Sequence, residues 1–410
     1  MAEGPLATQC CIAGGGPAGM MLGLLLARSG VDVLVLEKHA DFLRDFRGDT
    51  VHPSTLQVLH ELGLLDAFLA RPHQRVPTIG AEIGGEFLPI ADFTRLPTAG
   101  RFIALMPQWD FLDFLAGHAG RYRGFRLMMH AEVIGLIEAD GQVRGVRANT
   151  PDGPIEVRAG LVVGADGRHS TVRARAGLDV LDIGAPIDVL WMRLSRRPGD
   201  AAQTLGRIAA GRILVMLDRG DYWQCAYVIE KGGFDAVRRQ GIDALRDAIA
   251  GVAPELRDRL GELRDFDDAK LLTVTIDRLR RWHRPGLLCI GDAAHAMSPV
   301  GGVGINLAIQ DAVATANILA AALRQGTPEE RLLRRVQRRR TFPTRATQRL
   351  QVVVQNRVIR RVLAGERRAR LPLAVRLLRR WPALRRVPAR LIGMGFRPEH
   401  VRTPEITPPP

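Results

Sequence analysis

The segment Ile12-Ala-Gly-Gly-Gly-Pro-Ala-Gly19 directly follows a strand-like apolar run and opens a helix-like run that ends near Ser29. Gly14, Gly16 and Gly19 have the spacing G-x-G-x-x-G. In this pattern the first glycine permits a tight turn, the second lets the backbone approach a pyrophosphate, and the third lets the helix pack on the strand. The N-terminus of the helix then faces the negative charge of the phosphates. The segment therefore predicts a βαβ unit that binds a dinucleotide.

A second apolar run over residues 31–37 completes the βαβ unit and ends in Glu37. A carboxylate at the end of the second strand can accept hydrogen bonds from the hydroxyls of a ribose. The same carboxylate disfavours a ribose that carries a 2′-phosphate. Glu37 therefore favours FAD or NAD as the bound dinucleotide.

The segment Gly164-Ala-Asp-Gly-Arg-His-Ser-Thr-Val-Arg173 again places a glycine and an aspartate behind an apolar strand, residues 161–164. A turn of this kind can bring Asp166 close to both the neighbouring strands and the cofactor. Arg173, at the end of the same segment, is predicted to hold the geometry of the turn. We therefore expect the segment to form a second wall of the nucleotide site.

The third segment is Gly291-Asp-Ala-Ala-His-Ala-Met-Ser-Pro-Val-Gly-Gly-Val-Gly-Ile-Asn306, again after an apolar strand. Asp292 at the strand end suits a ribitol hydroxyl. The stretch Pro299–Gly304, here named the flavin loop, leads into a long apolar helix. Its backbone N–H groups and the helix N-terminus are predicted to face the electron-rich edge of a flavin ring. His295 is a candidate general base, but we interpret it as a helix-start residue that supports the loop.

Together the three segments resemble those of the FAD-dependent aromatic hydroxylases, the family of p-hydroxybenzoate and phenol hydroxylases (group A flavoprotein monooxygenases). The resemblance spans about residues 9–322. It implies an α/β fold in which a Rossmann-like FAD-binding domain of the GR2 type is interleaved with a β-sheet substrate domain and followed by C-terminal helices. The larger phenol hydroxylases carry a thioredoxin-like C-terminal domain, whereas this chain carries Arg-rich helices there.

The resemblance also assigns residues to the cofactor. They belong to the glycine turn and its acidic partner, to an arginine before the next helix, to a glutamine at the start of a later helix, and to the two aspartate segments with the flavin loop. They are Gly14, Gly16, Pro17, Ala18, Gly19, Glu37, Lys38, Arg47, Gln108, Asp166, Asp292, Pro299, Gly302, Gly304, Ile305 and Asn306.

The resemblance implies a monooxygenase that uses FAD as its cofactor and NAD(P)H as a transient reductant, because the chain shows no second Rossmann motif. Oxygen would pass from O2 through a C4a-hydroperoxyflavin to an aromatic, phenolic or polyketide-like small molecule. The flavin leads this chemistry, so no catalytic side chain and no metal site are predicted. Two alternatives remain: a flavin-dependent reductase or dehydrogenase of a lipid or isoprenoid at a membrane surface, and a non-redox protein that merely binds FAD.

The substrate is expected between the flavin ring and a meander of strands over residues 183–230. The candidate substrate residues are Met216, Tyr222, Gln224 and Tyr227. Alternation along a strand places Tyr222 and Gln224 on one face and their immediate neighbours on the other. The sequence leaves open which face points inward.

The sequence predicts a discontinuous domain organisation. Residues 1–70, 101–180 and 270–325 are assigned to the FAD-binding domain, 71–100 and 181–269 to the β-rich substrate domain, 326–402 to an Arg-rich helical region, and 403–410 to a disordered tail. The helical region is expected to break at Pro343, Pro372, Pro382 and Pro388.

The formal net charge of +15 comes almost entirely from arginine, and much of the excess follows Arg331. We interpret these arginines as solvated helix faces, with a peripheral contact to an acidic membrane surface as the alternative. Aromatic residues make up only 5% and no nucleic-acid-binding module is recognisable, so a nucleic-acid partner is not expected. The four cysteines show no metal spacing and no secretory signal precedes the first strand, so a cytoplasmic location is expected.

Overall fold

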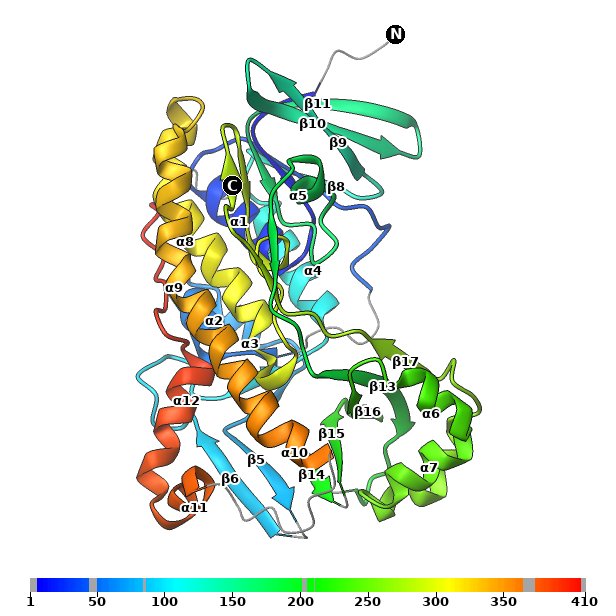
Figure 1. Ribbon diagram of the computed structural model, residues 1–410. Coiled ribbons are helices and arrows are strands. Elements are labelled where there is room, and N and C mark those ends of the chain that lie inside the picture. Colours follow the sequence, from blue (N-terminus) through cyan, green and yellow to red (C-terminus); the bar gives the residue numbers. More distant parts are fainter. Residues whose placement is uncertain are drawn as a thin grey trace.

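The computed structural model describes residues 6–43, 50–83, 86–200, 205–209, 211–363 and 373–406. Two large sheets organise these residues (Figure 1). One sheet carries the glycine-rich segment at residue 12, and the strands of the other alternate with it along the chain in two groups, residues 78–92 and 187–272. Two long helices, α8 (Gly304–Gln325) and α9 (Glu330–Val354), pack against each other beside the first sheet.

Eight strands form the first sheet. They are β1 (Leu6–Ala13), β2 (Val33–Leu36), β8 (Phe125–Met128), β9 (Glu132–Ala139), β10 (Gln142–Thr150), β11 (Gly153–Gly164), β19 (His283–Arg284) and β20 (Leu287–Cys289). The order is β19-β20-β11-β1-β2-β8, and β10 and β9 extend from β11 as an antiparallel meander. The strands β20, β11, β1, β2 and β8 are mutually parallel, so their carboxyl ends meet at one edge.

Helices α1 (Pro17–Arg28), α4 (Gln108–Ala119) and α8 pack beside this parallel sheet. Helix α1 is buried along almost its whole length, as expected of a helix that is apolar on all sides. The stretch Val300–Gln325, which includes α8, is the one described helix long and apolar enough to cross a membrane, and 72% of its most apolar window is buried in the protein. Burial of this kind is typical of a core helix.

Seven strands form the second sheet. They are β5 (Thr78–Ile83), β6 (Glu86–Asp92), β13 (Ile187–Ser195), β14 (Leu205–Ala209), β15 (Arg212–Asp218), β16 (Tyr222–Glu230) and β17 (Ala269–Leu272), in the order β17-β13-β16-β15-β14-β5-β6. One face is covered by α6 (Phe234–Gln240), α7 (Ile242–Ala250) and the 3-10 helix η1 (Pro254–Glu262) (Figure 1).

Smaller elements connect the two sheets. The antiparallel strands β12 (Val180–Asp182) and β18 (Asp277–Leu279) form a two-stranded ribbon at the crossings between them. The strands β3 (Thr50–Val51), β4 (Gln74–Val76) and β7 (Ile103–Leu105) form a third sheet, with the helices α2 (Pro53–Glu61) and α3 (Leu65–Leu69) between β3 and β4 in sequence. A short helix, α5 (Thr171–Arg175), follows β11.

The prediction of a helix break at Pro343 is wrong, because α9 continues through that residue. A proline inside a helix removes one backbone hydrogen bond and costs about 3 kcal/mol. Buried contacts on both sides of it hold the helix in place: Arg340 donates to Asp311 at 2.8 Å, and Gln348 donates to the backbone of Asp277 and Ala296 at 2.7 and 3.1 Å. Tertiary packing therefore outweighs the local preference of proline.

After α9 the chain forms a π-helical turn, Gln355–Ile359, and then α10 (Arg360–Leu363), α11 (Leu373–Arg380), a 3-10 turn η5 (Pro382–Arg385) and α12 (Arg386–Gly393). Helices α11 and α12 pack on β6, the edge strand of the second sheet (Figure 1). Ala389 and Met394 join Phe93 and Ile103 in a small apolar cluster there. The Arg-rich region thus covers a strand edge that would otherwise be open to pairing.

The prediction of a disordered tail is wrong for its first part, Thr403–Ile406. The Arg28 guanidinium donates to the Thr403 carbonyl at 2.9 Å, and the Ile406 N–H donates to the Arg28 carbonyl at 3.0 Å. The C-terminal end of α1 therefore supplies partners for backbone groups that the proline-rich tail cannot satisfy within itself. Residues 407–410 lie outside the described chain.

Candidate active site

The glycine turn lies at the carboxyl end of β1, between that strand and α1. Gly14 has a φ of +105°, and a Cβ there would lie 2.4 Å from the Ala165 carbonyl oxygen. A Cβ on Gly19 would lie 1.9 Å from the Gly14 carbonyl oxygen. At Gly16, by contrast, no atom lies within 4 Å of the Cβ position, and no side chain caps the start of α1. Gly14 and Gly19 thus permit the close packing of the turn. Gly16 leaves open space before the N-terminus of α1, where a phosphate fits.

Glu37 lies at the end of β2, beside the glycine turn, and is 8% exposed. Its Oε2 accepts the Gly15 N–H at 2.8 Å, and its Oε1 accepts the His39 N–H at 3.1 Å. The carboxylate is therefore fixed next to the open space at Gly16. This position fits an acceptor for ribose hydroxyls.

The second and third segments meet the first at the same sheet edge. The Ala165 N–H donates to the Ala13 carbonyl at 2.8 Å, and the Ile290 N–H donates to the Gly164 carbonyl at 2.9 Å. Three segments that are more than a hundred residues apart therefore form one continuous wall, because the strands that precede them are parallel neighbours.

Asp166 holds the start of helix α5. Its Oδ2 accepts the Val172 N–H at 3.0 Å, and its Oδ1 accepts the Ser170 hydroxyl at 2.5 Å. Burial raises the pKa of this carboxyl, although these hydrogen bonds oppose the shift. The cofactor role predicted for Asp166 remains a prediction. The structure itself gives the side chain a helix-capping role.

Asp292 lies in a 3-10 turn directly after β20, and its side chain is about one-third exposed. Arg168, a residue that the sequence analysis did not single out, lies 3.8 Å from it. This pair joins the second segment to the third at the open side of the sheet edge. A half-buried carboxylate and guanidinium at this position fit a polar ligand chain such as ribitol phosphate.

The flavin loop is fixed by hydrogen bonds to β3 and α2. Thr50 donates its hydroxyl to the Gly302 carbonyl at 2.9 Å. Asn306 accepts the His52 N–H at 2.8 Å and the Thr55 hydroxyl at 2.7 Å, and donates to the Thr50 carbonyl at 3.1 Å. The buried Asn306 side chain therefore positions the loop. No side chain caps the start of α8, so this helix N-terminus is suited to face an electron-rich ring edge.

Other predicted cofactor residues occupy the surroundings. Pro17 and Ala18 begin α1, Lys38 is exposed directly after Glu37, and Gln108 is the first residue of α4. Pro299, Gly304 and Ile305 lie in or next to the flavin loop and are half-buried. Arg47 lies outside the described residues. The ligand contacts of all these residues remain predictions.

Beneath the third segment lies a buried ionic network that the sequence analysis missed. The Asp311 carboxylate, on α8, accepts the Gly291 N–H at 3.1 Å and the Arg340 Nε–H at 2.8 Å, and lies 2.5 Å from His295 Nε2. Burial alone would raise the pKa of Asp311, but His295 and Arg340 hold it below its ordinary value. Arg340 also donates to Glu399 at 3.3 Å. The sequence does contain a signal for this network, because Asp311 is the single aspartate within a long apolar helix.

His295 follows the 3-10 turn Gly291–Ala293 and does not begin a helix, contrary to the interpretation from the sequence, and its support of the flavin loop remains a prediction. It is 1% exposed, and its ring packs on Trp282 at 4.9 Å between centroids.

The structure places two of the four substrate candidates away from the site. Met216 and Tyr227 lie in the apolar cluster that includes Leu245 of α7 and Leu256 of η1. This is the outer face of the second sheet, so their prediction as substrate residues is wrong. The amino acids alone could not show it, because both faces of these strands carry apolar residues.

Tyr222 and Gln224 lie on the opposite face. Gln224 is buried and accepts a hydrogen bond from Arg219 at 2.9 Å. Arg193 stacks over the Tyr222 ring at 3.8 Å. Six residues of extended strand, about 20 Å, separate Tyr222 from Val228, which packs with the flavin loop. The two polar residues therefore lie toward the far rim of this face.

The inner face next to the flavin loop is apolar, and the sequence analysis missed its residues. Val300 packs against Ile213 and Val228. Strand register places Val215 and Trp191 beside Ala226 on the same face as Val228, and both are half-buried.

The first sheet carries a glycine turn, an acidic strand end and a fixed loop at the carboxyl edge of its parallel strands, and the second sheet, which is mixed, presents an apolar face to that loop. This arrangement defines a flavoprotein fold with a separate substrate layer. The sequence model of a family described as "FAD binding domain" matches residues 7–350. The chain belongs to this family and is an FAD-dependent monooxygenase, with NAD(P)H as reductant.

The relatives narrow the class further. The chain is 36% identical over 401 residues to the 6-methylpretetramide 4-monooxygenase of Streptomyces rimosus, covering 97% of this chain and 94% of that protein. It is similar in structure to the anhydrotetracycline hydroxylase OxyS of Streptomyces rimosus, with a TM-score of 0.74, 25% identity, and coverage of 95% and 76%. It is also 28% identical to the dialkyldecalin synthase of Streptomyces rugosporus over 333 residues, covering 77% of this chain and 66% of that protein.

Proposed function

We propose that the protein hydroxylates a polycyclic aromatic substrate of the polyketide type. The observation that carries the proposal is the apolar, half-buried sheet face formed by Trp191 and Val215, which continues along the same strands from the cluster on which Val300 of the flavin loop packs. A flat apolar surface suits a fused-ring molecule, because burial of aromatic area stabilises binding without specific polar partners. Similarity along nearly the whole chain to the 6-methylpretetramide 4-monooxygenase supports the same substrate class.

In this proposal the residues of the chain bind FAD and the substrate, orient them and exclude water. The N-terminus of α1 and the open space at Gly16 would bind the pyrophosphate of FAD, Glu37 the ribose, and Asp292 the ribitol chain. The start of α8 would stabilise negative charge on the ring edge. Bound FAD supplies the redox and oxygen chemistry.

The test is oxygen-isotope labelling with a linear tetracyclic aromatic probe. NAD(P)H consumption in ¹⁸O2, with one labelled oxygen in the product, supports the proposal. NAD(P)H consumption without oxygen, and an unlabelled product, would instead identify a reductase or dehydrogenase. Conversion without any NAD(P)H consumption would identify a non-redox FAD-bound catalyst. This outcome is included because the chain is similar to the dialkyldecalin synthase.

The C-terminal region adds a second proposal, a peripheral contact with an acidic membrane surface. Trp381 and Val387 are 53% and 54% exposed and lie beside Arg385 and Arg386. Apolar side chains flanked by arginine are typical of interfacial segments. Co-sedimentation with vesicles rich in phosphatidylserine, but not with phosphatidylcholine vesicles, supports the contact. Recovery of the protein in the supernatant with both kinds of vesicle rejects the contact.

The four free, buried cysteines support a cytoplasmic location.

A further inference from the structure

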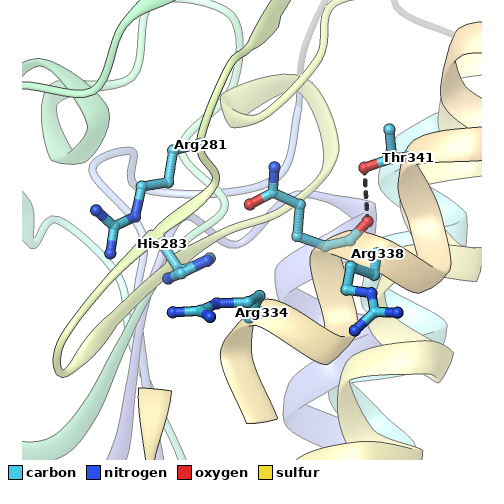
Figure 2. A pocket seen from close by; sticks show the side chains of 6 residues that line it. Arg281, His283, Arg334, Arg338 and Thr341 are labelled. Atoms are coloured by element: carbon cyan, nitrogen blue, oxygen red, sulfur yellow. Dashed lines mark hydrogen bonds between the residues drawn. The ribbon is translucent and has the colours of Figure 1, made fainter. Parts of the chain in front are cut away.

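A basic groove lies between α9 and the segment Asp277–Arg284, which contains β18 and β19. It consists of two adjoining cavities of about 440 and 250 Å³ that share Gln337 and Thr341 as lining residues. Figure 2 shows the larger cavity, with Arg281 and His283 on one side and α9 on the other. None of the predicted flavin-site residues lines either cavity.

Guanidinium groups dominate this groove. Arg281, Arg334 and Arg338 line the larger cavity, and the smaller one is lined by Arg278, Arg280 and Arg345. Glu330 is the acidic partner of Arg281 and lies 4.0 Å from Arg334. Across the described chain, Arg280, Arg338 and Arg345 form no ion pair with a carboxylate. The positive charge of the groove is therefore largely uncompensated.

The electrostatic environment of Arg278 agrees with this. Burial, followed by the neighbouring charges of Arg345, Arg349 and Arg280, lowers the pKa of Arg278 below its ordinary value. Such mutual repulsion disfavours the arrangement unless an anion lies among the guanidinium groups.

A buried hydroxyl gives a second, independent indication of a ligand. Thr344 lines the smaller cavity, is 0% exposed, and its Oγ1 has no hydrogen-bond partner. A buried polar group without a partner costs about 1–3 kcal/mol, so such groups are rare in native proteins. The hydroxyl would reach an anionic oxygen in the cavity by rotation of the Thr344 side chain, because its present position is closed to solvent.

We propose that this groove binds a small oligophosphate, such as inorganic pyrophosphate or the diphosphate group of a nucleotide, at a site separate from the FAD site. Arg280 and Arg345 bind one phosphate, Arg338 reaches the next, and Thr344 donates its hydroxyl. Guanidinium groups match phosphate oxygens in paired hydrogen bonds. The larger cavity, of about 440 Å³, has the size of small-ligand sites, which range over ~300–1,000 Å³, and the cavity of about 250 Å³ adjoins it.

The test is isothermal titration of the FAD-loaded protein with inorganic pyrophosphate, so that the dinucleotide site is already filled. Saturable binding with one equivalent, weakened about tenfold or more in the double variant Arg280→Gln/Arg345→Gln, supports the proposal. Thr344→Val, which keeps the shape and removes the hydroxyl, is expected to weaken binding about threefold to tenfold.

The matched control is the double variant Arg379→Gln/Arg380→Gln, which removes the same charge from the exposed helix α11. It is expected to bind pyrophosphate like the wild type. Equal weakening in the control, or an absence of saturable pyrophosphate binding while long polyanions such as heparin still bind, overturns the proposal in favour of a non-specific basic surface. Because no turnover is measured, this result is independent of the hydroxylase activity.

Discussion

His295 Nε2 and Asp311 Oδ2 lie 2.5 Å apart in the protein interior, with both side chains at most 1% exposed. The second Asp311 oxygen accepts from Arg340 of the C-terminal region. The turn that carries Asp292 is thereby joined to α8 and α9 through one carboxylate. Helix α9 of the C-terminal region is thus part of the support of the candidate active site.

Asp311→Asn is expected to destabilise the protein by about 3–5 kcal/mol, because it removes the buried carboxylate that His295 and Arg340 share and leaves Arg340 with Glu399 alone. Urea unfolding measures the free-energy change, and flavin absorbance measures the accompanying loss of bound FAD. The control is Arg331→Gln, at the exposed start of α9. It removes a solvent-exposed ion pair with Glu329 and is expected to change neither the unfolding free energy nor the bound FAD. Wild-type stability in Asp311→Asn would refute the network's structural role.

Gly16→Ala separates ligand binding from folding. The added Cβ meets no protein atom within 4 Å, and the φ of −73° suits alanine, so the thermal midpoint of the FAD-free protein is expected to stay unchanged. The methyl group occupies the space that the pyrophosphate needs, so the FAD affinity is expected to fall about tenfold or more, ~1.4 kcal/mol. Gly117→Ala, an equally open glycine on α4, is the control and is expected to retain FAD. Undiminished affinity in Gly16→Ala would place the pyrophosphate elsewhere.

Glu37→Gln tests the ribose contact. The amide keeps the size of the side chain but loses the charge that accepts hydrogen bonds, so FAD binding is expected to weaken by about 1–3 kcal/mol. Quenching of flavin fluorescence gives the dissociation constant. Glu156→Gln, at an exposed glutamate of β11, is the control. An unchanged constant in the Glu37 variant argues against the ribose role.

Val215 and Met216 are neighbours on β15 that face opposite sides of the sheet. Val215→Phe is expected to raise the KM for the aromatic substrate with little change in stability, because its side chain lies on the half-buried inner face. Met216→Ala is expected to cost about 2–5 kcal/mol of unfolding free energy, because it leaves a cavity under α7. The reverse pattern, with KM altered only in the Met216 variant, would show that substrate binds on the outer face.

His52 is expected to make the protein acid-sensitive. Burial, opposed by a hydrogen bond to the Ile392 carbonyl at 2.8 Å, lowers its pKa from 6.5 to about 4. The unfolded chain therefore binds the proton more tightly. The stability associated with neutral His52 is present above pH 6.5 and is lost as the pH falls towards 4, by roughly 3 kcal/mol. Urea unfolding across this range measures the slope, and His52→Gln is expected to flatten it. A slope unchanged in the variant would assign the acid sensitivity to other groups.

The sequence determined the dinucleotide-binding βαβ unit and the family, because these depend on local rules. Gly14 and Gly19 stand where a Cβ would collide with backbone atoms, and Glu37 ends a strand of fixed direction. Such constraints act over a few residues and are visible as spacing.

The tertiary structure alone decided which sheet face meets the flavin loop, whether α9 survives Pro343, and where the tail from Thr403 lies. Both faces of β15 carry apolar residues, so alternation could not separate Met216 from Val215. The helix and the tail are held by partners such as Asp277 and Arg28, which are distant in sequence. Packing energies of this kind arise only when the whole chain has folded, and they outweigh the local preferences that a sequence displays.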